Sequence, residues 1–148
     1  AALDGYSYLK ENKAHFGGEG LVSTMKDFAK FCEMLVNNGN YNGIQIVSKK
    51  GIEIMTSKYS NGYPDPNEPF AFPDLVGYYY GFTFWVLEKP ELDRTGAPKG
   101  IYGWSGYHNT HFWIDTENKL FGLFMSRAIE FDFSILRRFK LASYQLID

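Results

Sequence analysis

The sequence predicts an α+β fold in which an antiparallel sheet is flanked by helices. Three observations predict it. Apolar residues recur at helical spacing near both ends of the chain, a proline-rich stretch separates the early helices from the rest, and β-prone segments with short turns fill much of residues 77–126. The predicted order is two helices, a loop, about three antiparallel strands and a closing helix, which is typical of a segregated α+β architecture.

The clearest helix follows a glycine-rich turn at residues 17–20. Thr24 can cap its first turn, and the residues 37–39, Asn-Asn-Gly, end it. Its apolar face is formed by residues at i, i+3, i+4 and i+7, namely Phe28, Phe31, Cys32 and Leu35. Ser48 can cap a second, shorter helix from Lys49 to about Ser57.

The remaining chain is mostly extended. Four prolines make a regular element between Asn61 and Asp74 unlikely to form, so an irregular loop is expected there. Gly77 to Leu87 is nearly continuous in β-prone residues and predicts one strand covered on both faces. Further extended pieces are predicted at Ile101–Gly106 and Thr110–Ile114, and Leu120–Ser126 is expected to return as an antiparallel partner. A closing amphipathic helix follows, capped by Asp132 or Ser134.

Composition excludes several partners and cofactors. The 148 residues fit a single domain, and the formal charge of −2 comes without a basic run, so neither nucleic acid nor an anionic membrane surface is an expected partner. No apolar run reaches the length of a membrane span. Cys32 is the only cysteine, and phosphate-binding glycine loops are absent, so we expect no cofactor and no metal site.

The histidines and the one Ser-x-x-Lys spacing at a helix start do not predict a metal site or a nucleophile. His108 and His111 are three residues apart in extended chain, where side chains of opposite parity face opposite sides, so they are not expected to share a metal. Each is expected to lie at the surface or to be partly packed. Ser23 and Lys26 have Ser-x-x-Lys spacing, but they lie at a helix start, where capping explains them.

The most informative segment is residues 102–110. Gly103 and Gly106 bracket Trp104-Ser105 next to strand sequence, which indicates a place where something approaches the backbone closely. The alternative is that Trp104 lies in the core and the glycines mark a β-bulge. Residue types alone favour this second interpretation.

Several segments in order resemble the serine β-lactamase and penicillin-binding-protein-like family. They are residues 17–24 with 27–31 and 34–35, Asn42-Gly43 with 46–48 and 54–56, Gly81-Phe82, residues 103–106 and residues 112–115. In that family Ser-x-x-Lys supplies nucleophile and base, Tyr-x-Asn assists proton transfer, and Lys/His-Thr/Ser-Gly on a strand forms the opposite wall of the cleft. Trp104-Ser105-Gly106 resembles this third motif, with Trp in place of the cation as in esterase-like members.

The resemblance implies a function and a domain organisation. It implies that Trp104 shapes an acyl pocket, that Ser105 and Gly106 form the wall, and that the Tyr107 N–H is one oxyanion donor. The nucleophile would lie upstream, so residues 1–148 are predicted to be the C-terminal portion of one incomplete domain, inactive alone. The expected partners are the N-terminal part of that domain, or self-association, and a small ester or amide substrate. The resemblance favours a periplasmic or secreted location over a cytoplasmic one.

Two other functions stay open from the sequence. One is a noncatalytic relative that binds an acylated or peptidoglycan-like ligand in the same cleft. The other is an independent aromatic-rich module that stacks its 11 Tyr and 3 Trp residues on sugars. An acyl-enzyme serine hydrolase (esterase, amidase or β-lactamase-related) is the leading hypothesis.

Overall fold

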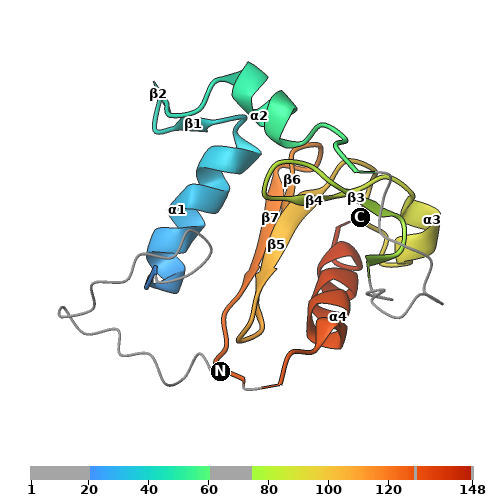
Figure 1. Cartoon of the computed structure of the whole chain (residues 1–148). Coiled ribbons are helices and arrows are strands. Elements are labelled where there is room, and N and C mark those ends of the chain that lie inside the picture. Colours follow the sequence, from blue (N-terminus) through green and yellow to red (C-terminus); the bar gives the residue numbers. More distant parts are fainter. Residues whose placement is uncertain (1–20, 61–74, 129, 148) are drawn as a thin grey trace.

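The computed structural model describes residues 21–60, 75–128 and 130–147 (Figure 1). It contains four helices and seven strands in these ranges, and five of the strands form one antiparallel sheet in the order β3-β4-β5-β6-β7. The helices are α1 (Met25–Val36), α2 (Lys49–Met55), α3 (Pro90–Asp93) and α4 (Phe133–Tyr144). The strands of the sheet are β3 (Tyr78–Tyr80), β4 (Trp85–Leu87), β5 (Tyr102–Gly106), β6 (Thr110–Asp115) and β7 (Leu120–Phe124). The predicted α+β class is confirmed.

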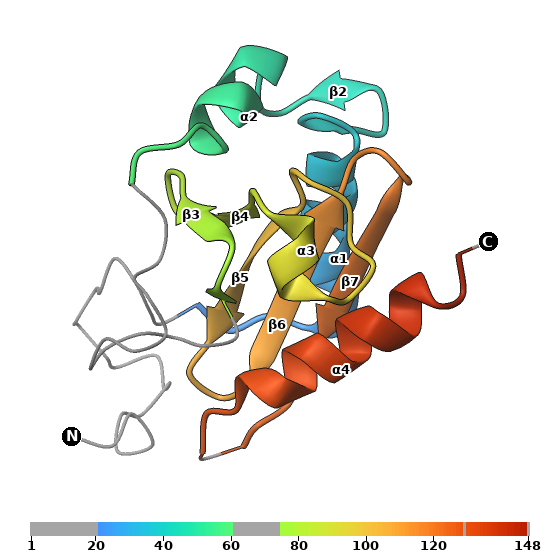
Figure 2. The ribbon, with the colours of Figure 1, turned by 90° about the vertical axis from the view of Figure 1, so that its right-hand side faces the viewer.

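The sheet lies between two layers of helix. Figure 1 shows α1 on one side and α4 on the other, and Figure 2 shows α3 and α4 in front of the strands. Alternation along β6 divides its side chains between the two layers. Phe112 and Ile114 pack in the cluster that contains α1 residues, and Trp113 packs in the cluster that contains Leu136 of α4. The sheet therefore has an apolar core on each face.

The predicted caps form as the sequence indicates. The Thr24 hydroxyl accepts from the Asp27 N–H at 3.1 Å, and the Ser48 hydroxyl accepts from the Gly51 N–H at 3.0 Å. Asp132, rather than Ser134, is the N-cap of α4. Each cap satisfies an N–H group that has no partner within its own helix, which is why these boundaries can be predicted from the sequence.

The prediction of one strand from Gly77 to Leu87 is wrong. The chain folds back within this range, so that β3 pairs with β4 and Tyr80 lies opposite Trp85. Thr83 adopts a positive φ of 65° in the turn, a conformation that β-branched residues rarely adopt. Gly81, whose N–H donates to the Phe84 carbonyl at 2.9 Å, begins this turn and is its sequence signal, but the strand-like composition around it hides it.

Two small elements were not predicted. β1 (Asn40–Tyr41) and β2 (Ile44–Gln45) form a hairpin around Asn42 and Gly43, which both have positive φ. This is the conformation for which Asn-Gly is favoured in two-residue turns. α3 is the second missed element. The predicted lead-in at residues 1–15, the turn at 17–20 and the loop at Asn61–Asp74 lie outside the described residues. No helix in the described ranges is long and apolar enough to span a membrane.

Candidate active-site wall on strand β5

Strand β5 carries the predicted motif without a bulge. It pairs with β6 in unbroken register from Tyr102 opposite Ile114 to Gly106 opposite Thr110. The glycines are required by close packing instead. A Cβ at Gly103 would lie 2.0 Å from the Phe112 carbonyl oxygen, and one at Gly106 would lie 2.3 Å from Thr110 Oγ1. The interpretation of these glycines as bulge markers is therefore wrong.

One edge of β5 is open at the motif. β4 pairs with β5 only at Gly103 and Tyr102. Along residues 104–106, no other strand within the described ranges pairs with the side of β5 that faces away from β6. The motif therefore lies where β5 continues past its neighbour, and this edge can receive an extended ligand or another segment by main-chain hydrogen bonding.

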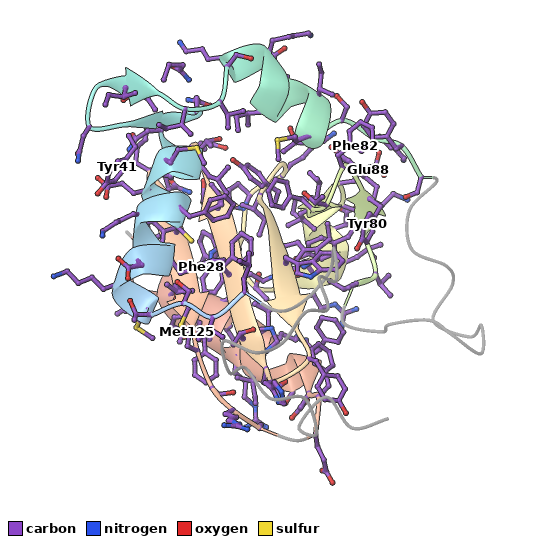
Figure 3. The ribbon with its side chains drawn as sticks, turned by 60° about the vertical axis from the view of Figure 1, so that its left-hand side comes forward. Phe28, Tyr41, Tyr80, Phe82, Glu88 and Met125 are labelled. Atoms are coloured by element: carbon purple, nitrogen blue, oxygen red, sulfur yellow. The ribbon has the colours of Figure 1, made fainter. Side chains whose placement is uncertain are left out.

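Trp104 lies at the surface rather than in the core. Its side chain is 39% exposed, and its ring meets the edge of the Tyr80 ring at a centroid distance of 5.3 Å and an angle of 88°. Figure 3 labels Tyr80 and Phe82 on the same side of the molecule, by β3 and β4, and the Phe82 ring centroid lies 4.4 Å from that of Tyr59. The alternative that placed Trp104 in the core is wrong. These rings form an exposed aromatic surface beside the motif.

Ser105 has a partner that the sequence analysis missed. The register places His111 directly opposite Ser105, and His111 Nδ1 lies 2.9 Å from Ser105 Oγ. His111 is 1% exposed, whereas Ser105 is half-buried. The imidazole lies among the rings of Phe124, Phe131 and Phe133. The expectation of a surface or partly packed histidine is thus wrong for His111.

The Ser105–His111 pair lacks the features of a nucleophile and its base. Burial lowers the pKa of His111 to about 4, and the nearby Asp132 carboxylate opposes this shift only in part. A general base works best with a pKa near the working pH, and a catalytic histidine is usually oriented by a third group. Among the residues that the structure describes, His111 Nε2 is buried without a hydrogen-bond partner. The geometry therefore does not make Ser105 an activated nucleophile.

The buried side chain of Asn109 holds the turn between β5 and β6 in place. This residue is fully buried and has a φ of 57°, which Asn tolerates better than most residues. Its side chain donates to the Glu130 carbonyl and accepts from the Asp132 N–H at 2.7 Å. The turn is thereby tied to the segment that leads into α4.

Tyr107 begins this turn, and its backbone N–H has no partner among the described residues. The Tyr107 side chain is 51% exposed. The turn closes instead through the Asn109 N–H, which donates to the Gly106 carbonyl at 3.0 Å. A free amide at the end of a fixed strand can donate to an incoming oxygen atom.

The four predicted site residues are consecutive and lie together at the end of β5. Trp104, Ser105 and Gly106 occupy the strand and Tyr107 the turn. Two other features weighed in the sequence, the Ser23–Lys26 spacing and a metal site, lie apart from this motif. Ser23 and Lys26 are exposed at the start of α1, as expected of a cap. No group of His, Cys, Asp and Glu suited to a metal is present among the residues that the structure describes.

The arrangement of the helices and the sheet is similar to part of a solved protein. A penicillin-binding protein homolog from Caulobacter crescentus has a similar fold, with a TM-score of 0.54 and 20% sequence identity. The similarity covers 78% of this chain and 29% of that protein. The chain belongs to the beta-lactamase family, whose sequence model matches residues 1–141. The resemblance seen in the sequence motifs is thus confirmed.

Two curated relatives come from Mycobacterium tuberculosis. They are "Uncharacterized protein MT1414" of strain CDC 1551 / Oshkosh and "Protein Rv1367c" of strain ATCC 25618 / H37Rv. Each is 25% identical to this chain over 111 residues, which covers 73% of this chain and 28% of the relative. The chain therefore spans less than a third of the length of these relatives.

Proposed function

We propose that this chain supplies one wall of the active site of a serine hydrolase that cleaves an ester or amide through an acyl-enzyme. Membership of the beta-lactamase family supports a hydrolase-related fold. The observation that carries the proposal is the end of β5, where an open strand edge, the Ser105 hydroxyl and the free Tyr107 N–H adjoin. A wall of this kind binds and orients a carbonyl that a nucleophile elsewhere attacks.

The Tyr107 N–H is the proposed oxyanion donor on this chain. Attack on an ester or amide carbonyl moves negative charge onto its oxygen, and an N–H fixed before the reaction stabilises that charge without reorganisation. Removing one such donor in other enzymes costs about a hundredfold to a thousandfold in rate. The Asn109 hydrogen bonds hold the turn that carries this N–H.

Trp104 is proposed to select an apolar acyl group over an anionic one. Its indole, half-exposed against Tyr80, offers area for stacking or apolar contact and carries no charge for a carboxylate. The proposal therefore favours an esterase or amidase and disfavours recognition of a substrate through a carboxylate at this position.

The nucleophile is proposed to lie on another part of a longer protein. The chain spans 28% of its M. tuberculosis relatives, and β7 has no second strand partner within the described ranges. Among the described residues, sixteen large hydrophobic side chains are more than a third exposed, several of them in and before α1, including Leu21, Val22 and Met25. An open strand edge and an exposed apolar surface are places where another segment, or a second copy, would pack.

A fluorophosphonate probe tests this function. In the longer protein, we expect labelling of one serine outside residues 1–148, and no labelling of the isolated chain. Ser105→Ala in the longer protein should lower kcat/KM for a p-nitrophenyl ester by roughly tenfold to a hundredfold, whereas Ser57→Ala, at the exposed end of α2, should leave it unchanged. Labelling of Ser105 itself, or full activity of the Ser105→Ala variant, would contradict the proposal.

The exposed aromatic surface favours a second candidate, ligand binding without catalysis. The Tyr59 and Phe82 ring centroids lie 4.4 Å apart with the planes tilted by 42°, and the side chains are 56% and 53% exposed, as a sugar- or acyl-binding platform would be. Saturable binding of a glycan by the isolated chain, lost in Phe82→Ala, would support this candidate. It would gain further support if the longer protein were inert to the fluorophosphonate probe.

A further inference from the structure

We infer that His111 is a positioning residue that donates its Nδ1–H to Ser105, so that Ser105 offers its own proton to an acceptor on the substrate. This inference rests on the proposed function for its meaning, but the tautomer of His111 can be measured without any activity. It assigns a role to a residue outside the Trp104-Ser105-Gly106 motif.

Burying an imidazole at position 111 costs free energy. His111 is 1% exposed and surrounded by phenylalanine rings, a setting that a phenylalanine would fill without desolvating a ring nitrogen. An unsatisfied buried polar atom costs free energy, and Nε2 is such an atom here. The contact that distinguishes histidine from phenylalanine at this position is the one between Nδ1 and Ser105 Oγ at 2.9 Å.

The surroundings of the His111 ring decide which of its nitrogens carries the hydrogen. The low pKa of His111 leaves the ring neutral at neutral pH, so only one nitrogen bears hydrogen. Proteins leave buried N–H groups without acceptors less readily than they leave acceptors without donors. The lone Nε2 is therefore better accommodated as an acceptor, and Nδ1 carries the hydrogen.

The indole nitrogen of Trp85 provides a comparison. Its Nε1 is also buried without a partner in the described part of the chain. An indole always carries its hydrogen on that nitrogen, whereas a neutral imidazole can move its hydrogen to the nitrogen that has a partner. His111 can avoid the unpaired donor that Trp85 must keep.

The consequence falls on Ser105. A hydroxyl is one donor and can accept two hydrogen bonds. If Nδ1–H donates to Oγ, the hydroxyl hydrogen is free, and no described residue other than His111 bonds this side chain. The complementary group on the substrate is an oxygen acceptor, such as an ester or amide carbonyl, rather than an ammonium or amide N–H.

Nitrogen-15 NMR of the imidazole rings tests the tautomer directly. We expect long-range proton–nitrogen correlations of the Nδ1–H pattern for His111 at pH 7, assigned by their loss in His111→Phe. His108 is an internal reference, because its Nδ1 lies 3.2 Å from the Ala128 carbonyl oxygen and must donate to it. An Nε2–H pattern or an imidazolium at pH 7 would overturn the inference, whether or not the longer protein is a hydrolase.

Kinetics of the longer protein test the positioning role. His111→Phe, which keeps the shape and removes the donor, should lower kcat/KM for an ester by roughly tenfold, the effect of losing about one hydrogen bond. His111→Asn, whose amide N–H can replace Nδ1–H, should recover much of that loss.

In a Ser105→Ala background, His111→Phe should have no further effect. An equal loss in both backgrounds would assign His111 a purely structural role and overturn the inference. A wild-type protein without esterase activity would refute the proposed function and leave the NMR result to decide the tautomer.

Discussion

Two buried polar clusters on the α4 side of the sheet differ in how completely their groups are paired. In the first, Lys140 of α4 donates to Asp93 at 2.7 Å and to the Tyr78 hydroxyl, and Tyr78 and Thr95 donate to the same carboxylate. In the second, His111 contacts Ser105 through one nitrogen and leaves the other unpaired. In the first cluster, both the carboxylate and the ammonium have hydrogen-bond partners. In the second, one imidazole nitrogen has none among the described residues.

The difference separates a structural role from a site role. The first cluster joins β3, α3 and α4, and burial together with the neighbouring Asp93 raises the pKa of Tyr78, so its hydroxyl stays a donor. A fully paired buried network stabilises a particular packing. The second cluster keeps an unpaired atom next to a half-exposed serine at an open strand edge. A buried group that is left incomplete requires an explanation, and here it adjoins the candidate active site.

The largest expected effect comes from breaking the paired cluster. Lys140→Met keeps most of the side-chain volume but leaves the Asp93 carboxylate buried without its cation. Removing one partner of a buried ion pair costs about 3–5 kcal/mol, which urea unfolding of the chain will measure. Lys50→Met provides the matched control, because Lys50 pairs with Glu53 at the surface at 2.9 Å.

The double variant separates pairing from packing. Lys140→Met with Asp93→Asn removes both charges, and we expect it to be more stable than Lys140→Met alone. A Lys140→Met chain that unfolds at the same urea concentration as Lys50→Met would mean that the cluster contributes little. The contrast between the two polar clusters would then fail.

The second effect is the pH dependence contributed by His111. Its folded pKa of about 4 lies below the ordinary value of 6.5. The unfolded chain therefore binds one more proton between these values, and the free energy of unfolding falls as the pH falls through this window. The full loss is roughly 3 kcal/mol, and it is absent above pH 6.5.

His111→Phe should remove this dependence. Unfolding free energies measured at pH 7 and pH 4.5 should differ less in the variant than in the unsubstituted chain. The charged group that faces His111 is Asp132, which both proteins retain. Equal pH dependence in the two proteins would show that His111 is not buried as a neutral ring, and the second cluster would then no longer differ from a surface histidine.

The sequence predicts the two clusters unequally, and the reason is physical. Helix caps such as Thr24 and the motif on β5 depend on residues close in sequence, so local patterns are sufficient to predict them. The Ser105–His111 pair follows from one hairpin: counting outward from the three-residue turn at Tyr107–Asn109 places Ser105 opposite His111. The spacing of His108 and His111 along one strand does not reveal this pairing, because it relates His111 to its own strand and not to β5.

The paired cluster could not be predicted in this way. Lys140 lies 47 residues from Asp93 and 62 from Tyr78, and only the packing of α4 on the sheet brings them together. One local clue exists, since Lys140 follows buried Leu136 by one helical turn and so lies on the apolar face. The missed β3–β4 turn is different, because it lies within one hairpin in which Tyr80 is opposite Trp85. Gly81 is a local turn signal there, but the aromatic residues around it are typical of a strand and obscure it.

The smallest expected effect concerns Asn109, which links the turn at the candidate site to the segment before α4. Asn109→Gly keeps the positive φ but leaves the Glu130 carbonyl and the Asp132 N–H without their partner, at a cost of about 1–2 kcal/mol. Asn109→Ala loses the same hydrogen bonds and adds the strain of φ 57°, about 1 kcal/mol more. Urea unfolding measures both.

If Ala is tolerated as well as Gly, the turn has relaxed to another conformation. In the longer protein, Asn109→Ala should then also lose ester hydrolysis through displacement of the Tyr107 N–H. If Gly is the less stable of the two, the positive φ is not what limits this position, and the turn is held by its other hydrogen bonds, such as those that Ser126 donates to the His108 and Asn109 carbonyls.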